Sequence, residues 1–155
     1  MVIQNGLATG SIPDNRGGGM YSDNSSPILT NCTFTDNEAP YGGGLANYYN
    51  CSPTLSNCTF TSNSAWIGGG AYIDEGTPVL SDCSFFDNVA SDYGGGMFIQ
   101  NSIADLNICT FNGNTAVEGG GGVLFALSNA TLTDCTFNQN HGDNGGGLFC
   151  TAFGS

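Results

Sequence analysis

The pattern Phe-x-x-Asn recurs five times in this chain at a nearly constant spacing. Successive phenylalanines are 26, 25, 26 and 26 residues apart, and they are Phe34, Phe60, Phe85, Phe111 and Phe137. The asparagines three positions later are Asn37, Asn63, Asn88, Asn114 and Asn140. Runs of three glycines interleave with these copies and begin at Gly17, Gly42, Gly68, Gly94, Gly120 and Gly145. A fixed period of this length indicates one structural unit stacked on itself.

Two apolar columns accompany the phenylalanine. A leucine lies five positions before it, at Leu29, Leu55, Leu80, Leu106 and Leu132. A cysteine lies two positions before it, at Cys32, Cys58, Cys83, Cys109 and Cys135. Positions three apart cannot both face inward on a straight strand, so we expect a bend near Thr30–Asn31. We expect the asparagine to turn the chain at a corner and to bond to its copies above and below.

These columns predict an all-β fold, a right-handed parallel β-helix of about six coils of 25–26 residues with three short strands per coil. Leucine-rich repeats and propeller blades have other periods, and helical repeats would not tolerate the glycine runs. We expect one domain over residues 1–155, with residues 1–16 as a partial first coil and residues 145–155 as a partial last coil. Matching Ser155 to Asn129 would make Val2-Ile3 equivalent to Thr131-Leu132, so that the chain holds close to six whole turns with open, uncapped ends.

The charge balance excludes several partners. The net charge is −12, with Arg16 as the single basic residue other than His141. Nucleic acid and anionic membrane surfaces bind clustered Lys and Arg, so neither is expected. The longest apolar runs are too short to span a membrane, and Met1–Asn5 has no signal-peptide pattern.

An aromatic stripe follows the glycine runs, two positions after each run in four of six copies. Its members are Tyr21, Tyr72, Phe98 and Phe149. Strict alternation along a strand would point this column outward. Two interpretations stay open: an exposed stripe that binds glycans or a protein partner, or a column covered by other parts of the chain.

No constellation predicts catalysis or a cofactor. We interpret the cysteine column as small buried side chains rather than disulfides, and no Cys-x-x-Cys pair suggests zinc. Asp36 and Asp87 share a column two rungs apart, as do Asp82 and Asp134, which is too far for a retaining carboxylate pair. His141 lies near Asp143 but lacks a serine nucleophile. Calcium remains a candidate at turn carboxylates, namely Asp36, Asp74, Glu75, Asp87 and Asp143.

The alternation of Gly-Gly-x-[Leu/Val/Met] with Phe-x-x-Asn resembles the repeats of the chlamydial polymorphic outer membrane proteins. The segment Ser26–Phe34 is also similar to a wider group of bacterial and archaeal surface proteins with right-handed β-helix repeats. The resemblance covers residues 2–150. It implies a β-helix passenger, adhesin or envelope protein, without an active site to transfer and without the membrane barrel of autotransporters.

We therefore expect a non-enzymatic, extracellular or cell-surface structural solenoid. It would associate with itself head to tail into fibrils or form the stalk of a surface protein. The alternative is an adhesin-like or glycan-binding module that uses the aromatic stripe.

Overall fold

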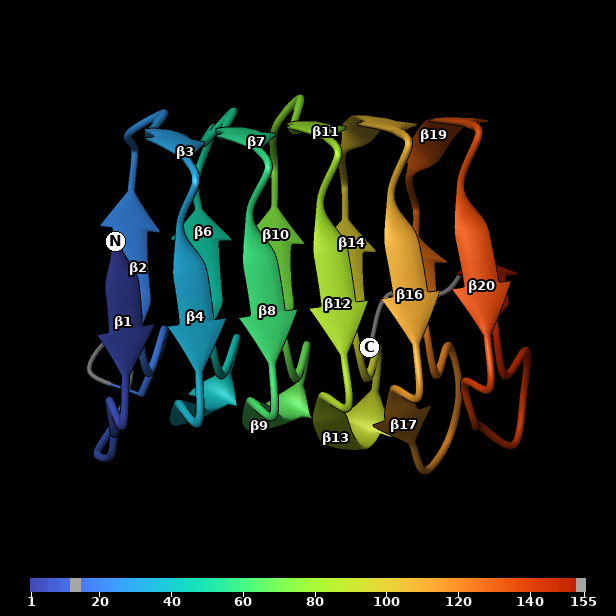
Figure 1. Cartoon of the computed structure of the whole chain (residues 1–155), viewed down its shortest axis with the longest axis horizontal. Helices are drawn as coiled ribbons and strands as arrows, with labels where there is room; N and C mark the ends of the chain where they lie inside the picture. Colours follow the sequence, from blue (N-terminus) through green and yellow to red (C-terminus); the bar gives the residue numbers. More distant parts are fainter. Residues whose placement is uncertain (12–14, 153–155) are drawn as a thin grey trace.

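A computed structural model describes residues 1–11 and 15–152, and every regular element in these ranges is a β-strand (Figure 1). All strand pairs are parallel, and each strand pairs with its equivalents one coil before and after it. The strands form four sheets along the length of a solenoid, which we label A to D in the order that a complete coil follows from β4 onward.

Sheets A and C each contain six strands. Sheet A consists of β1 (Val2–Gln4), β4 (Thr33–Thr35), β8 (Thr59–Thr61), β12 (Ser84–Phe86), β16 (Thr110–Asn112) and β20 (Thr136–Asn138). Sheet C consists of β2 (Met20–Asp23), β6 (Leu45–Tyr48), β10 (Ala71–Asp74), β14 (Met97–Gln100), β18 (Val123–Ala126) and β21 (Leu148–Thr151). In Figure 1 sheet A faces the viewer and sheet C lies behind it.

Sheets B and D are shorter and close the two sides of the coil. Sheet B consists of β5 (Glu38–Tyr41), β9 (Ser64–Ile67), β13 (Val89–Tyr93) and β17 (Thr115–Ala116). Sheet D consists of β3 (Ile28–Thr30), β7 (Thr54–Ser56), β11 (Val79–Ser81), β15 (Ile103–Asn107) and β19 (Asn129–Thr133). None of the described elements is a helix that could cross a membrane.

The predicted parallel β-helix is therefore the fold, but a coil contains four strands rather than three. The additional strands are those of sheet B, which carry the alanine column that begins with Ala39 and Ala65. Two to five residues in length, they lie between the asparagine corner and the glycine run. A segment this short has too few residues to show alternation in the sequence.

The chain makes about five full turns, and the predicted phase of its first strand is wrong. Ile3 pairs in register with Phe34, not with the leucine column. Sheets A and C consequently have six strands where sheet D has five, so the described chain does not hold six whole turns. The predicted position of Ser155 lies outside the described residues.

A left-handed residue occupies each corner of the coil. Asn31 has φ 54° at the bend between sheets D and A, where the sequence predicts a bend. At the corner between sheets A and B the left-handed residue is Asp36, φ 54°, and not the expected Asn37. The difference has a physical reason, because Asn37 is buried and its amide is engaged by the neighbouring coils.

The glycine runs turn the chain from sheet B into sheet C. The first glycine of each run has a positive φ, for example 65° at Gly42 and Gly94. The third glycine is required for a different reason, the close approach of the next coil. A Cβ added to Gly96 would lie 2.5 Å from the carbonyl oxygen of Gly122.

Candidate functional site

The phenylalanine and asparagine ladders form the interior of the solenoid. Rings of successive phenylalanines stack nearly parallel, and the centroids of Phe60 and Phe85 are 4.7 Å apart. Each asparagine amide bonds to the next coil and to the preceding one. The Nδ2 of Asn63 donates to the Oδ1 of Asn88 at 2.9 Å and to the carbonyl oxygen of Phe34 at 3.0 Å. These residues are fully enclosed in the middle coils, so they serve the fold and are not accessible to a ligand.

The cysteine column lies beside these ladders, and all seven cysteines of the chain are free. The thiol of Cys58 donates weakly to the carbonyl oxygens of Ser56 and Leu29, at 3.4 and 3.6 Å. Hydrogen bonding with the thiols of Cys109 and Cys58, together with burial, raises the pKa of Cys83 well above its ordinary value. The inner cysteines, from Cys32 to Cys109, are buried and therefore closed to reagents in solution.

The aromatic stripe is covered, which corrects the expectation of an exposed binding stripe. Tyr72 and Phe98 are 5% and 1% exposed, and Tyr21 and Phe149 are partly buried. The column does point away from the phenylalanine interior, as alternation requires. It is covered from outside by side chains of the sheet B corner, so a second apolar cluster lies on the outer face of sheet C.

The covering side chains leave a groove of about 570 Å³ along this second cluster. We call it the tyrosine groove, and its lining residues are Arg16, Tyr41, Tyr48, Ile67, Tyr72, Asp92, Tyr93, Gln100 and Glu118. Tyr48 and Tyr72 stack with centroids 4.9 Å apart, and the ring of Tyr41 meets Tyr72 edge-on at 5.6 Å. Both stacked tyrosines are 5% exposed, and burial raises the pKa of Tyr48 to about 12.

Arg16 closes one end of the tyrosine groove. Its guanidinium carbon lies 3.4 Å from the centroid of the Tyr48 ring, and its Nη1 donates to the hydroxyl of Tyr21 at 3.3 Å. The side chain is only 9% exposed. Its Nε has no hydrogen-bond partner among residues 1–11 and 15–152.

Polar groups line the rest of the tyrosine groove. The hydroxyl of Tyr93 donates to a carboxylate oxygen of Glu118, and this bond raises the pKa of Tyr93. The Nε2 of Gln100 donates to Asp74 at 3.4 Å, while the buried Oε1 of Gln100 has no partner in the described part of the chain. The groove thus combines stacked rings with both donors and acceptors.

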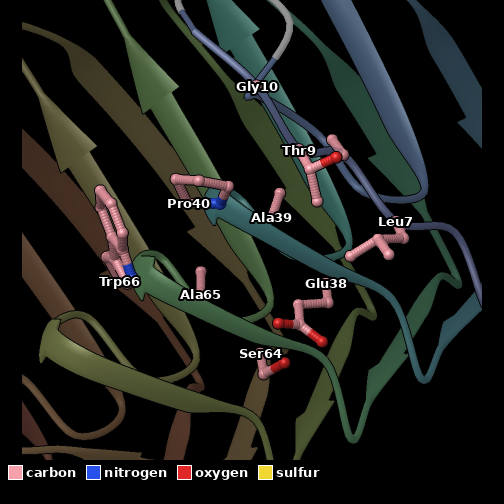
Figure 2. Close-up of a pocket in the computed structure, with 10 residues that line it drawn as sticks. Leu7, Thr9, Gly10, Glu38, Ala39, Pro40, Ser64, Ala65 and Trp66 are labelled. Carbon is pink, nitrogen blue, oxygen red and sulfur yellow. The ribbon is translucent and has the colours of Figure 1, made fainter.

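A second groove of about 360 Å³ crosses the outer face of sheet B (Figure 2). Trp66 lies at one end of it and Leu7 at the other, with Ala39, Ala65 and Pro40 along its floor. Trp66 and Leu7 are 59% and 65% exposed. Polar groups are few here, with Glu38 and Ser64 on the strands and Thr9 on the crossing segment.

One long connection contributes to both grooves. Seventeen positions separate Ile3 from Met20, whereas eleven or twelve separate the equivalent residues in later coils, such as Phe34 and Leu45. This connection contains Leu7 and Thr9 of the second groove and Arg16 of the tyrosine groove, and its ends stay in register because Leu7 bridges to Glu38 and Arg16 to Tyr41. The first coil is therefore the least regular one, and its long connection supplies lining residues to both grooves.

The carboxylates that the sequence singles out do not gather. Asp36 and Asp87 lie at equivalent corners of coils separated by an intervening coil with Ser62. Within the described ranges, no group of three or more His, Cys, Asp and Glu side chains could hold a metal ion. His141 joins Thr115 through an isolated backbone bridge.

Both end faces of the solenoid leave the ladders incompletely covered. In the last coil Leu132, Cys135 and Phe137 are only partly buried, and so are Ile3, Met20 and Leu29 at the other end. Their equivalents in the middle coils, such as Leu80 and Phe85, are 0% exposed. The ends therefore expose the same apolar columns that hold the interior together.

A family model described as a right-handed β-helix region matches residues 11–155. The chain belongs to this family. No curated protein and no solved structure matches it significantly. The match supports a β-helix repeat protein and does not extend to the finer repeat-level resemblance to the chlamydial proteins.

Sequence reasoning located the ladders but missed both grooves. The tyrosine groove depends on Tyr41, Tyr48 and Tyr93, which belong to no uniform column because their equivalents include Ile67 and Asp74. The long first connection was visible as an irregular spacing before Phe34. Arg16 directly precedes the first glycine run, as Tyr41 and Tyr93 precede later runs, and this shared position is the sequence signal that places them side by side.

Proposed function

We propose that this β-helix is a non-enzymatic structural protein that stacks head to tail through its two end faces. The observation that carries the proposal is the partial exposure of Leu132, Cys135 and Phe137 in the last coil. A further coil would bury them, and burial of apolar surface stabilises association by about 25 cal/mol per Å² before the costs of assembly. A second copy offers such a coil, beginning with Ile3 and β1.

The backbone of the last coil also supports stacking. Gly147 occupies the column of Gly96 and Gly122, where each glycine accommodates a carbonyl oxygen of the next coil. A Cβ on Gly122 would lie 2.4 Å from the carbonyl oxygen of Gly147, but a Cβ on Gly147 would meet nothing nearer than Phe137 at 3.4 Å. The face beyond Gly147 is therefore shaped for another coil, and the Gly19 of a second copy would be its neighbour.

Unpaired strand edges add to this tendency. Within the described ranges, β20 pairs with another strand on one side only, as do β1 and β2 at the opposite end. Such edges template further parallel pairing, and a contact between unlike ends gives filaments rather than closed rings. At the junction sheets A and C would continue directly, while sheet D would lack one strand.

Electron microscopy of the purified 155-residue chain at high concentration tests this proposal. We expect fibres from the parent chain. Gly147→Ala should remain monomeric because its Cβ would meet the adjoining coil, yet it should unfold at the parent's temperature. Trp66→Ala, which alters the lateral surface, should form fibres normally. A monodisperse parent chain, or unchanged fibres from Gly147→Ala, would refute head-to-tail stacking.

We also propose an extracellular or cell-surface location, either as such a fibril or as part of a surface stalk. Support comes from the repeat resemblance and from a composition in which only 9% of the residues are charged. Fractionation of the source cells with an antibody against the chain measures the location directly. Recovery only from the cytosolic fraction would refute it.

A further inference from the structure

We propose that the tyrosine groove binds a neutral glycan chain lying along the solenoid axis. This site is separate from the end faces, so it goes beyond the structural role. It shares only Tyr72 with the predicted aromatic stripe, and its other rings come from Tyr41, Tyr48 and Tyr93. The proposal rests on the shape of the groove, on its unsatisfied polar atoms and on the charges around it.

The polar atoms without partners favour a ligand that can both accept and donate hydrogen bonds. Among residues 1–11 and 15–152, the Nε of Arg16 is a buried donor without an acceptor and the Oε1 of Gln100 is a buried acceptor without a donor. Leaving such groups unpaired is unfavourable, and for the charged guanidinium especially so. A hydroxyl group both donates and accepts hydrogen bonds, so a polyhydroxylated ligand satisfies both kinds of group.

The ring faces favour a ligand with flat C–H surfaces. Tyr48 and Tyr72 form the stacked floor, and the partly exposed rings of Tyr41 and Tyr93 rise at the side. Ligand sites commonly combine apolar and aromatic walls with a few placed polar groups. The C–H face of a pyranose ring packs on such rings while its hydroxyl groups point to Arg16, Gln100 and the rim.

The charges around the groove disfavour an anionic ligand, and Arg16 already occupies the ring that a cationic ligand would use. Asp92 and Glu118 lie on the rim and Asp74 lies beside Gln100, so an anionic glycan would meet three carboxylates and one guanidinium. A cationic ligand would compete for the Tyr48 ring, where Arg16 already supplies the cation–π contact. A neutral ligand can donate hydroxyl hydrogens to the rim carboxylates without either penalty.

The length of the groove indicates a chain rather than a single sugar. Arg16 is bridged to Tyr41, Tyr41 pairs with Ile67, Ile67 with Tyr93, and Tyr93 with Gly119. These four steps between successive coils span roughly 19 Å at the usual spacing of parallel strands. The groove follows this line, so a linear oligosaccharide would lie across several coils.

Affinity electrophoresis in native gels tests the proposal. The gels contain hydroxyethyl cellulose or galactomannan as neutral glycans, polygalacturonate as the acidic one, or no glycan. We expect at least one neutral glycan to retard the parent chain more than polygalacturonate does. Tyr93→Ala removes a partly exposed ring and should weaken retardation about tenfold, which corresponds to ~1.4 kcal/mol. Arg16→Ala should act in the same direction.

Matched controls separate this groove from the rest of the surface. Trp66→Ala removes an exposed aromatic ring outside the groove and should leave retardation unchanged. Gly147→Ala should also bind normally, so failure of axial stacking would not affect the result. Near-ultraviolet circular dichroism confirms that each variant is folded. The proposal is overturned if no neutral glycan retards the parent, if polygalacturonate binds better, or if Tyr93→Ala binds as the parent does.

Discussion

At the scale of single residues, the buried asparagines show how a polar side chain can belong to a core. The Oδ1 of Asn88 accepts from both the backbone nitrogen and the Nδ2 of Asn63, and its own Nδ2 donates to Phe60 and Asn114. Each amide is thus shared by neighbouring coils. Polar groups that are fully paired in this way specify register as well as stability.

Truncation of this amide should be costly. Asn88→Ala would leave several buried partners unpaired, each at about 1–3 kcal/mol, so we expect a loss of at least ~3 kcal/mol in the free energy of unfolding. Asn138→Ala is the matched control, because Asn138 is exposed and should change stability by less than about 0.5 kcal/mol. Denaturant titrations of both variants measure the difference. Equal losses in the free energy of unfolding would show that Asn88 does not belong to a buried ladder.

The buried tyrosines predict a pH dependence on the alkaline side. Burial raises the pKa of Tyr48 to about 12, above the ordinary value near 10, so the folded state favours the neutral phenol. The stability that this group contributes is complete below pH 10 and is lost as the pH rises towards 12. Tyr48→Phe should flatten the fall in melting temperature over this window. Identical alkaline profiles for the parent chain and Tyr48→Phe would contradict the burial of Tyr48.

At the scale of elements, each coil is constrained by the coil that follows it. The third glycine of a run illustrates this. It must be glycine because a Cβ would collide with the next coil, and not because of its own φ. Gly96→Ala should strongly destabilise the protein, since its Cβ would lie 2.5 Å from a backbone oxygen that cannot move without distorting the sheet. Gly147→Ala makes the same change where no coil follows and should be tolerated. Thermal melts of the two variants measured at low concentration test this contrast, and equal destabilisation would contradict it.

The same coupling explains what the sequence could and could not reveal. Columns that repeat in every coil, such as Leu80 or Phe85, could be placed inside from spacing alone because one residue type fills each rung. The strands of sheet B were missed because two to five residues show no alternation. The phase of Ile3 was wrong because the longer first connection breaks the period that the prediction extrapolated.

The tyrosine groove could not be predicted for a related reason. Alternation correctly turned Tyr72 and Phe98 away from the phenylalanine interior. It could not show that the glycine corner folds Tyr41 and Tyr93 over them, because this depends on the angle between sheets B and C. Sites formed between two outer faces depend on such angles rather than on any single strand pattern.

At the scale of the whole molecule, thiol reactivity reports which parts of the solenoid are closed. Cys150 is exposed in the last coil, although its partner in register, Phe125, is 2% exposed. We expect a thiol reagent to modify Cys150 first and Cys135 more slowly, because partial burial raises the pKa of Cys135. The other cysteines should react only on unfolding.

Assembly should alter this pattern in a specific way. A stacked copy would cover Cys150, so its modification should slow in fibres relative to the monomeric Gly147→Ala variant. Cys150→Ser removes the fast phase and identifies it. Fast modification of several cysteines in the folded monomer would show that the cysteine column is not interior.

The central claim is that successive coils place each side chain over its equivalent 25 or 26 residues away. Nuclear Overhauser contacts in the isotope-labelled monomeric Gly147→Ala chain test this most directly. We expect cross-peaks linking the ring of Phe85 to those of Phe60 and Phe111, and the side-chain amide of Asn88 to those of Asn63 and Asn114. Contacts that follow an antiparallel register, or the absence of contacts between these rings, would contradict the stacked solenoid.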